Sequence, residues 1–297
     1  MEITIGIDVG GTFAKIGLVD LQGNVIESLQ IPTEPKKGPA HFVKRAVALL
    51  KDWSFSSVGL GLAGGVDAVT GTLLFVPNLE GWTGFSFKKA FEKALSVPVI
   101  VDNDANVAVW GGYVAALHKK PRTVVGVTLG TGVGGGLILD GRLHRGATGS
   151  AGEIGHMTLE LAGPRCHCGR RGCLEAYAGT DGILRLARKR MRRLPFPLTP
   201  KAVAVAARAG DRGAIRVWEE VGARLGQGLA SLILVLNPDA ILLLGGVARA
   251  GKLVLDPVRR VFAAQPFREP FKKITLSAPL ERDWGVVGAA LLSRERR

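Results

Sequence analysis

The stretch Gly6-Ile-Asp-Val-Gly-Gly-Thr12 has a counterpart 120 positions further along the chain, at Gly126-Val-Thr-Leu-Gly-Thr-Gly132. In each copy an apolar run leads into a turn of glycine and threonine. A second apolar run follows, at Ile16–Asp20 in the first copy and at Gly136–Asp140 in the second. Apolar runs joined by a glycine turn are typical of paired strands. The matched positions around both turns predict a duplicated domain rather than a chance likeness of two strands.

Strands and helices alternate outward from the two copies. The apolar patterns predict further strands at 25–31, 58–62, 97–101 and 240–244, and helices at 41–53, 88–95, 103–117, 172–193, 201–209, 212–236 and 286–297. This alternation indicates an α/β fold with two related domains around a cleft. We expect an N-terminal domain over residues 1–116, on which a C-terminal helix at 285–297 packs, and a larger C-terminal domain over 117–284.

Composition excludes several classes of protein. The 297 residues are 47% hydrophobic, which allows a large core, yet no apolar run is long enough for a membrane span. The first strand begins at once, without a secretory signal, so we expect a soluble cytoplasmic protein with no membrane or nucleic-acid partner. The net charge of +14 is scattered except for a denser basic patch. A solvated helix face is the simpler interpretation of this patch and a polyanion site the alternative, for Arg185, Arg188, Lys189, Arg190, Arg192 and Arg193.

The glycine turns are candidate phosphate sites. Neither is a P-loop or a dinucleotide fingerprint, because no Gly-Lys-Ser/Thr follows and a strand rather than a helix comes next. Glycine nevertheless lets backbone N–H groups approach an anion closely. A third turn, Leu244-Gly-Gly-Val247, could admit a nucleoside or could simply be a packing turn. Two turns in register could bind a triphosphate, with the candidate residues Asp8, Gly10, Gly11, Thr12, Gly130, Thr131, Gly132, Gly134, Gly245 and Gly246.

The three cysteines of the chain lie together in Cys166-His-Cys-Gly-Arg-Arg-Gly-Cys173. An odd number at this spacing indicates metal ligation rather than disulfides. His156, ten residues before Cys166, completes a tetrahedral set that suits Zn²⁺. His167 is the competing fourth ligand, but its place between two ligating cysteines requires a strained turn. A site closed by Cys166, Cys168, Cys173 and His156 is structural rather than catalytic.

The segment Asp102-Asn-Asp-Ala-Asn106 lies where a predicted strand becomes a helix. A carboxylate at a strand end can act as the base that phosphoryl transfer to a hydroxyl requires. The same residues are also good helix caps, so the residues alone leave catalysis and capping open for Asn103 and Asp104.

These motifs resemble the actin-like ATPase superfamily and, more narrowly, the ROK family of bacterial sugar kinases and repressors. The resemblance covers nearly the whole chain, and the Cys-x-Cys-Gly-x-x-Gly-Cys-x-Glu cluster is its most specific part. Two positions depart from the family pattern, Ala63 where Pro is usual and Phe13 where Lys is usual. Neither change removes a group with a proposed chemical role.

The resemblance implies roles for individual residues. It makes Asp104 the general base and leaves Asp102, one residue earlier, facing elsewhere. It places Asp67 in a stretch near the sugar. The implied sugar-binding residues are Gly64, Gly65, Asn78, Asn103, Asp104, Glu153, His156 and Glu175, with the zinc loop holding the last two in position.

The activity implied is transfer of a phosphoryl group from ATP with Mg²⁺ to the exocyclic hydroxyl of a hexose. Glucose is the expected acceptor, because the segments Pro77–Trp82 and Cys173–Gly179 resemble the glucose-phosphorylating members most. Fructose, mannose and N-acylhexosamines are alternative acceptors, and polyphosphate is an alternative donor. A sugar-responsive repressor is less favoured, because those members carry an N-terminal helix-turn-helix whereas Met1 leads directly into a strand. We expect a homo-oligomer, a dimer or tetramer, that acts in carbohydrate metabolism.

Overall fold

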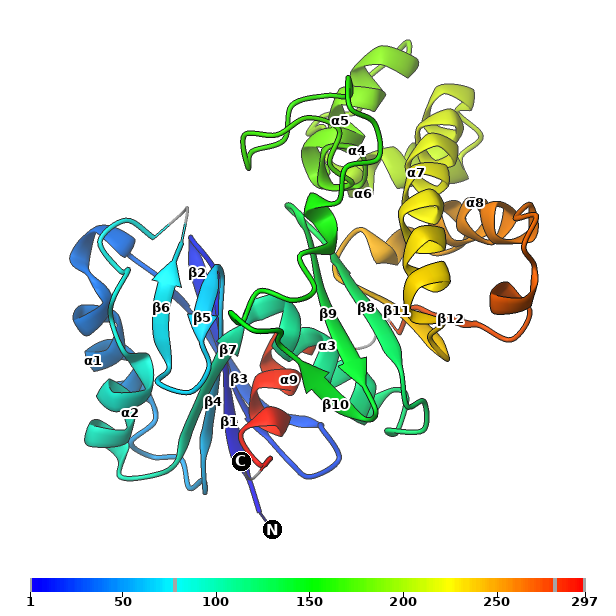
Figure 1. The fold of residues 1–297 in the computed structure, drawn as a ribbon. Coiled ribbons are helices and arrows are strands. Elements are labelled where there is room, and N and C mark those ends of the chain that lie inside the picture. Colours follow the sequence, from blue (N-terminus) through cyan, green and yellow to red (C-terminus); the bar gives the residue numbers. More distant parts are fainter. Residues whose placement is uncertain (1, 77–78, 280–281, 296–297) are drawn as a thin grey trace. The chain divides into compact units, whose positions relative to one another are not determined.

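The computed structural model describes residues 2–76, 79–279 and 282–295, drawn in Figure 1. The chain divides into two compact units. The first contains residues 1–120, 142–151 and 281–297, and the second contains 121–141 and 152–280. The sequence predicts residues 142–151 as part of the second domain, whereas here they cluster with the first unit.

The first unit is built on a five-stranded sheet with the order β3-β2-β1-β4-β7. Strand β2 runs antiparallel to β1 and β3, whereas β1, β4 and β7 are parallel. Helices α1 and α2 cover one face and α3 and α9 the other (Figure 1). The elements are β1 (Thr4–Val9), β2 (Phe13–Val19), β3 (Val25–Pro32), α1 (Pro39–Leu49), β4 (Val58–Leu62), β5 (Gly65–Asp67), β6 (Thr72–Phe75), α2 (Phe87–Leu95), β7 (Val99–Asn103), α3 (Asp104–Ala115) and α9 (Trp284–Leu292).

The second unit repeats this plan with the strand order β10-β9-β8-β11-β12. Strand β8 is antiparallel to β9 and parallel to β11, as β1 is to β2 and β4. Its elements are β8 (Val124–Leu129), β9 (Val133–Leu139), α4 (Glu175–Ala178), α5 (Thr180–Arg190), α6 (Pro200–Arg208), α7 (Arg212–Leu236), β11 (Ala240–Leu244), α8 (Lys252–Ala263) and β12 (Thr275–Ser277). The edge strand of this sheet, β10 (Arg142–His144), belongs to the residues 142–151 that cluster with the first unit. The matching strand orders confirm the duplicated α/β fold.

Buried aliphatic side chains fill a separate core in each unit. In the first, residues of β1, β4 and β7 pack with Phe42, Phe87, Phe91 and Trp82, which are fully buried. In the second, residues of β8 and β11 pack against α5, α6, α7 and α8 around Trp218. These cores hold the strand ends, and therefore the turns that follow them, in fixed positions.

Helix α9 lies unusually close to the first sheet. A Cβ on Gly59 of β4 would lie 1.8 Å from the carbonyl oxygen of Ala289 in α9. A Cβ on Gly288 of α9 would lie 1.6 Å from the carbonyl oxygen of Val107 in α3. Only glycine permits such contact between backbones, so α9 is an integral layer of the first unit.

One expected helix is interrupted. The sequence predicts a single helix over 172–193, but α4 ends at Ala178 and α5 begins at Thr180. Gly179 between them has extended backbone, with φ −74° and ψ 167°. Among the residues placed in the structure, no helix is long and apolar enough to cross a membrane.

Candidate active site

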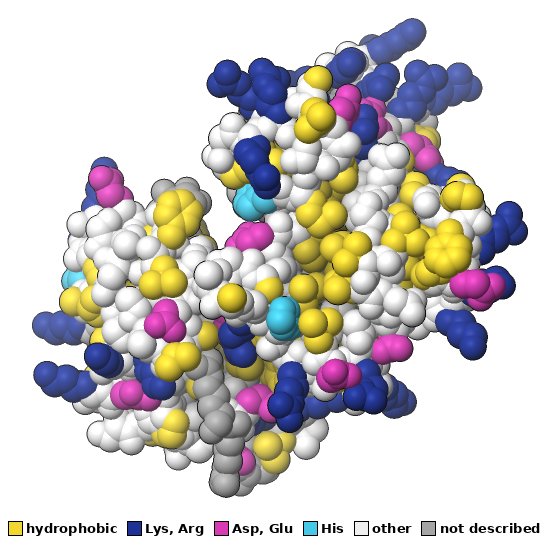
Figure 2. All heavy atoms as spheres, viewed as in Figure 1, with side chains coloured by type: hydrophobic (Ala, Val, Ile, Leu, Met, Phe, Trp, Pro, Cys, Tyr) yellow, Lys and Arg dark blue, Asp and Glu magenta, His cyan; other side chains and the backbone are white. Residues whose placement is uncertain are grey.

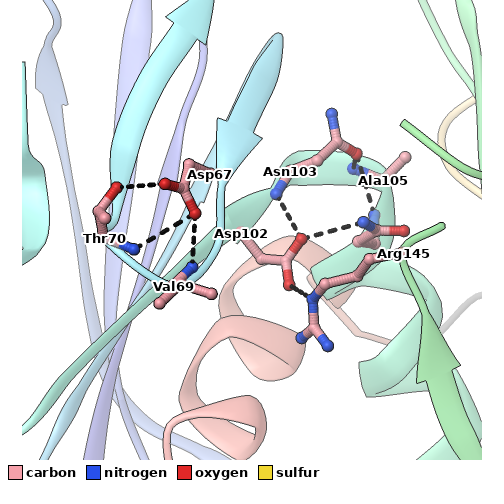
Figure 3. Close-up of polar contacts among 8 residues, drawn as sticks. Asp67, Val69, Thr70, Asp102, Asn103, Ala105 and Arg145 are labelled. Atoms are coloured by element: carbon pink, nitrogen blue, oxygen red, sulfur yellow. Dashed lines mark hydrogen bonds and ion pairs between the residues drawn. The ribbon is translucent and has the colours of Figure 1, made fainter. Parts of the chain in front are cut away.

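The acceptor segment lies where β7 passes into α3 (Figure 3). Asn103 is the N-cap of α3, because its Oδ1 accepts hydrogen bonds from the backbone N–H groups of Ala105 at 2.9 Å and Asn106 at 3.1 Å. Its Nδ2 donates to the carbonyl oxygen of Gly64 at 3.0 Å. Asp104 is the first helical residue, and its Oδ1 accepts from Ala105 N at 2.8 Å. The N-cap position of α3 is thus filled by Asn103, and the Asp104 carboxylate also accepts from one N–H of the first turn.

Asp102, which the resemblance leaves without a role, has a buried side chain that contacts Asn103, Asn106 and Arg145. The residue is 2% exposed and lies beneath the acceptor segment. Its Oδ1 accepts from Asn103 N at 2.8 Å and Asn106 Nδ2 at 2.9 Å, and its Oδ2 accepts from Arg145 Nε at 2.6 Å (Figure 3). The sequence does not predict this pair, because no spacing rule connects residues 43 positions apart.

Asp8 ends the first strand close to several charges. It pairs in register with Lys15 of β2, whose Nζ lies 2.7 Å from Asp283 Oδ2. Burial raises the pKa of Asp8 to about 7, the neighbouring carboxylates of Asp104 and Asp283 contribute to the rise, and Lys15 opposes them. A divalent cation favours the ionised form of such a carboxylate. The turn after Asp8 is fixed by Thr33, which donates from Oγ1 to Gly10 O at 2.7 Å and from N to Thr12 O at 2.9 Å.

Gly64, Gly65 and Asp67 form the start of a small hairpin, β5–β6. Gly64 has φ +107°, and a Cβ there would lie 2.2 Å from Phe75 O, so this turn requires glycine. The Asp67 carboxylate accepts from Val69 N at 2.9 Å and from Thr70 Oγ1 at 2.7 Å, which closes the turn between the two strands (Figure 3). Asn78 lies outside the described residues.

The second glycine turn joins β8 to β9, and Gly134 lies within β9. Thr180 at the start of α5 donates from Oγ1 to Gly130 O at 2.8 Å and from N to Thr131 O at 3.1 Å. The Glu175 carboxylate accepts from Val133 N at 3.1 Å and fills the space over Gly132, where a Cβ would meet it at 2.3 Å. In this structure Glu175 therefore touches the candidate phosphate turn.

The third glycine turn follows β11. Gly245 has φ +92°, and a Cβ there would lie 2.4 Å from Leu129 O. Val247 N donates to the same oxygen at 3.0 Å. Gly245 thus packs against the end of β8. Gly246 is exposed, and a Cβ there would meet none of the described residues within 4 Å.

His156, Cys166, Cys168 and Cys173 meet in the second unit, with their ligand atoms all within 4.8 Å of one another. Cys168 Sγ lies 3.7 Å from Cys173 Sγ, and Cys166 Sγ lies 3.8 Å from His156 Nδ1. In a tetrahedral site with Zn–S distances of about 2.3 Å, two sulfur ligands lie roughly 3.8 Å apart. Burial raises the pKa of the Cys166 and Cys173 thiols, so a cation is needed to hold them as thiolates. The set fits Zn²⁺.

The other ring nitrogen of His156 faces a different partner. Its Nε2 lies 4.0 Å from Glu153 Oε2, while Nδ1 faces the cysteine cluster. Glu153 is exposed and His156 is partly exposed. His167 lies outside the cluster, 3.3 Å from Asp181 Oδ2 and 83% exposed, so the structure favours His156 as the fourth ligand.

The sequence profile of the ROK family matches residues 4–296. The chain belongs to the ROK family. It is 35% identical to a glucokinase of Streptomyces coelicolor, covering 99% of this chain and 98% of the relative. A solved ROK family glucokinase from Streptomyces griseus, in complex with glucose and AMPPNP, is 35% identical with a TM-score of 0.85, covering 98% of this chain and 99% of that one. The xylose repressor of Bacillus subtilis is 27% identical, covering 90% of this chain and 70% of the repressor.

The ROK family has the actin-like ATPase fold, which agrees with the two matching sheets. Each unit brings part of the predicted site together. The first unit gathers Asp8, Gly64, Asn103 and Asp104, and the second joins Glu153, His156 and the cysteines to Glu175, which accepts from the Cys166 thiol at 3.3 Å.

Figure 2 shows Lys and Arg side chains gathered over the α5 end of the second unit. Two members of the basic patch have structural partners. Arg190 lies 2.8 Å from Glu220, and Arg185 donates to Ala176 O at 3.0 Å and stacks on Tyr177. The remaining members, Arg188, Lys189, Arg192 and Arg193, are exposed. This favours a solvated helix face for much of the patch.

Proposed function

We propose that this ROK family protein transfers the γ-phosphoryl group of ATP to the exocyclic hydroxyl of glucose, forming glucose 6-phosphate. The observation that carries the proposal is the match along nearly the whole chain to the Streptomyces griseus glucokinase that holds glucose and AMPPNP. The Asn103–Asp104 pair at the start of α3 supports it chemically. Fructose, mannose and N-acylhexosamines remain alternative acceptors.

Asp104 is proposed as the general base. It lies at the end of a buried parallel strand, where the helix cap is already supplied by Asn103. A carboxylate there can accept the hydroxyl proton as the oxygen attacks phosphorus. The nearby Asp8 carboxylate is then proposed to hold the water shell of Mg²⁺, whose charge also lowers the repulsion between the two carboxylates.

The sugar is proposed to be held by hydrogen bonds from residues with both donor and acceptor groups. A metal on Nδ1 of His156 leaves the proton on Nε2, so the ring donates from that side while Glu153 accepts. Zinc would thus fix the tautomer and orientation of a sugar ligand. The other proposed ligands are Gly64, Gly65, Asn78, Asn103 and Glu175.

The glycine turns are proposed to bind the triphosphate through backbone N–H groups, with Thr12 and Thr131 adding hydroxyls. Both threonines follow strand ends. Gly245 and Gly246 are proposed to lie beside the adenosine. We propose two actin-like domains with a boundary near residue 120, each of which contributes one of the two phosphate turns.

The thiolate set of the zinc loop is kept reduced in the cytoplasm, where we propose that the protein acts. We also propose that it is a homo-oligomer, since the C-terminal part of α7 exposes Leu234 and Val235, the latter 78% exposed.

A coupled ADP-release assay over a panel of hexoses with MgATP, and with polyphosphate in its place, tests the substrate assignments. Glucose with MgATP is expected to give the highest kcat/KM. Asp104→Asn is expected to lower kcat by about 10²–10⁴-fold with sugar and nucleotide binding retained. Asp211→Asn is a matched control, because Asp211 caps α7 by accepting from Ala214 N at 2.7 Å and Asn caps equally well. Activity of the Asp104 variant within about tenfold of wild type would exclude the base role.

A further inference from the structure

We propose that Arg145 is a positioning residue for phosphoryl transfer, which acts through the buried carboxylate of Asp102 to hold Asn103 and Asp104 in place. The proposal rests on the proposed function. It concerns a contact inside the first unit, because residues 142–151 cluster with that unit.

Asp102 links the strand end to the first turn of the helix. Its Oδ1 receives the N–H of Asn103 and the side-chain amide of Asn106, one turn into α3. The Asp102 carboxylate accepts from three donors at 2.6–2.9 Å, and these bonds fix its orientation. The orientation of the Asn103 peptide therefore depends on a buried carboxylate that Arg145 holds in place.

Arg145 supplies the charge that balances this carboxylate. Its Nε lies 2.6 Å from Asp102 Oδ2, and the two side chains are 27% and 3% exposed. A buried carboxylate that loses its charged partner is left uncompensated, so the side chain must rearrange or draw in water. Either outcome changes the hydrogen bonds that Asp102 makes to Asn103 and Asn106.

The acceptor residues depend on this geometry. Asn103 is bonded on both ends of its amide, to the helix N–H groups and to Gly64 O, so a shift of its backbone also moves Asp104. Displacement of a reacting group by about 1 Å costs on the order of 100-fold in rate. Arg145 is thus expected to influence chemistry without touching either substrate.

The origin of Arg145 adds a second consequence. It lies just after β10, and Glu153 follows eight residues later in the chain. Within the first unit, the ion pair thus joins residues 142–151 to the acceptor segment, although the two are remote in sequence.

The test compares kcat and KM for glucose and for MgATP in four variants of the full chain, alongside thermal unfolding. Arg145→Met and Asp102→Asn are each expected to lower kcat about 10- to 100-fold with the KM for MgATP within about twofold. The double variant Asp102→Asn/Arg145→Gln has no buried charge and can reform an amide–amide hydrogen bond, so it is expected to recover at least part of the kcat lost in either single variant. Arg190→Met, which breaks an Arg–Glu pair between α5 and α7, is the control and is expected to leave kcat unchanged.

Several results would overturn the proposal. A folded Arg145→Met variant with kcat within about twofold of wild type would exclude a positioning role. A rise in the KM for glucose alone would make Arg145 a sugar ligand instead. If the kcat of the double variant is no higher than that of the less active single variant, the pair stabilises the fold and does not position the acceptor residues. If Arg145→Met does not fold, the kcat values of Arg145→Lys and of the double variant are compared with wild type instead. Wild-type protein inactive on every hexose would contradict the proposed function, not this inference.

Discussion

Replacing Gly288 with alanine tests how closely α9 packs on the first unit. The new Cβ would lie 1.6 Å from Val107 O and 2.9 Å from Gly111 N. Carbon and oxygen normally make contact at about 3.4 Å or more, roughly twice the first distance. Both neighbours are backbone atoms of α3, so no side-chain rotation can relieve the clash, and α9 must move away from α3.

The cost can be bounded from other overpacked cores. Adding a methyl group to a well-packed site typically costs about 1–3 kcal/mol and occasionally more. Because the obstacle here is backbone, we expect at least about 3 kcal/mol for Gly288→Ala. For a domain of about 150–250 residues each kcal/mol lowers Tm by roughly 2–4 °C, so a fall of about 6–12 °C is expected.

Differential scanning calorimetry with limited proteolysis gives the measurement, since it separates the unfolding of the first unit from that of the second. Gly246→Ala is the matched control, because its Cβ position lies more than 4 Å from the rest of the described chain and its backbone is not left-handed. That variant is expected to change stability by about 0.5 kcal/mol or less. A Tm for Gly288→Ala within about 2 °C of the control, roughly half to one kcal/mol, would refute the backbone contact.

Two further predictions concern the charged groups and the metal. In protein free of Mg²⁺ and nucleotide, the pKa of Asp8 is about 7 in the folded state, compared with 3.8 as its ordinary value. The folded state therefore binds the proton more tightly than the unfolded state. As pH rises from about 4 to 7 this contribution lowers the free energy of unfolding, and above about pH 7 it stays constant. Asp8→Asn is therefore expected to be more stable than wild type at about pH 8 and equally stable at about pH 4 in thermal unfolding, while an equal difference at both pH values would contradict the shift. Cys168→Ser is expected to lose bound zinc and to lower Tm and activity together, because a closed site contributes to local folding. His167→Ala should keep the metal, and a zinc-free wild type with full activity would show that the metal assignment is wrong.

The elements best predicted from sequence are those whose pattern is local. Strands β4 and β11 and helix α7 have the predicted bounds, because each is a short apolar run or a long periodic segment between clear breaks. The sequence does not predict helix α8, since Pro257 lies inside it and is typical of a helix break. Strand β12 and the β5–β6 hairpin have strands of only three or four residues, which is too short for periodicity to show.

The candidate site divides in the same way. The zinc ligands could be predicted because three of them lie within eight residues and their chemistry is specific. The Asp102–Arg145 pair could not, because it depends on how residues 142–151 fold back on the first unit. Glu175 could be predicted in part. The family resemblance implies that it binds the sugar, but its contact with Gly132 and Val133 depends on the conformation of the turn before β9, which the sequence does not predict.

The place of α9 has a consequence for biosynthesis. This helix completes the first unit by packing on β1, β4 and α3, yet the ribosome makes it after the whole second unit. At about 5–20 residues per second, the 164 residues from Pro121 to Trp284 take roughly 8–33 s to synthesise. During that interval α9 is absent, so part of one face of the sheet formed by the first 120 residues is exposed to solvent. The nascent chain is therefore expected to present that apolar surface to chaperones, and premature termination before Trp284 should leave a product that is degraded rather than half-functional.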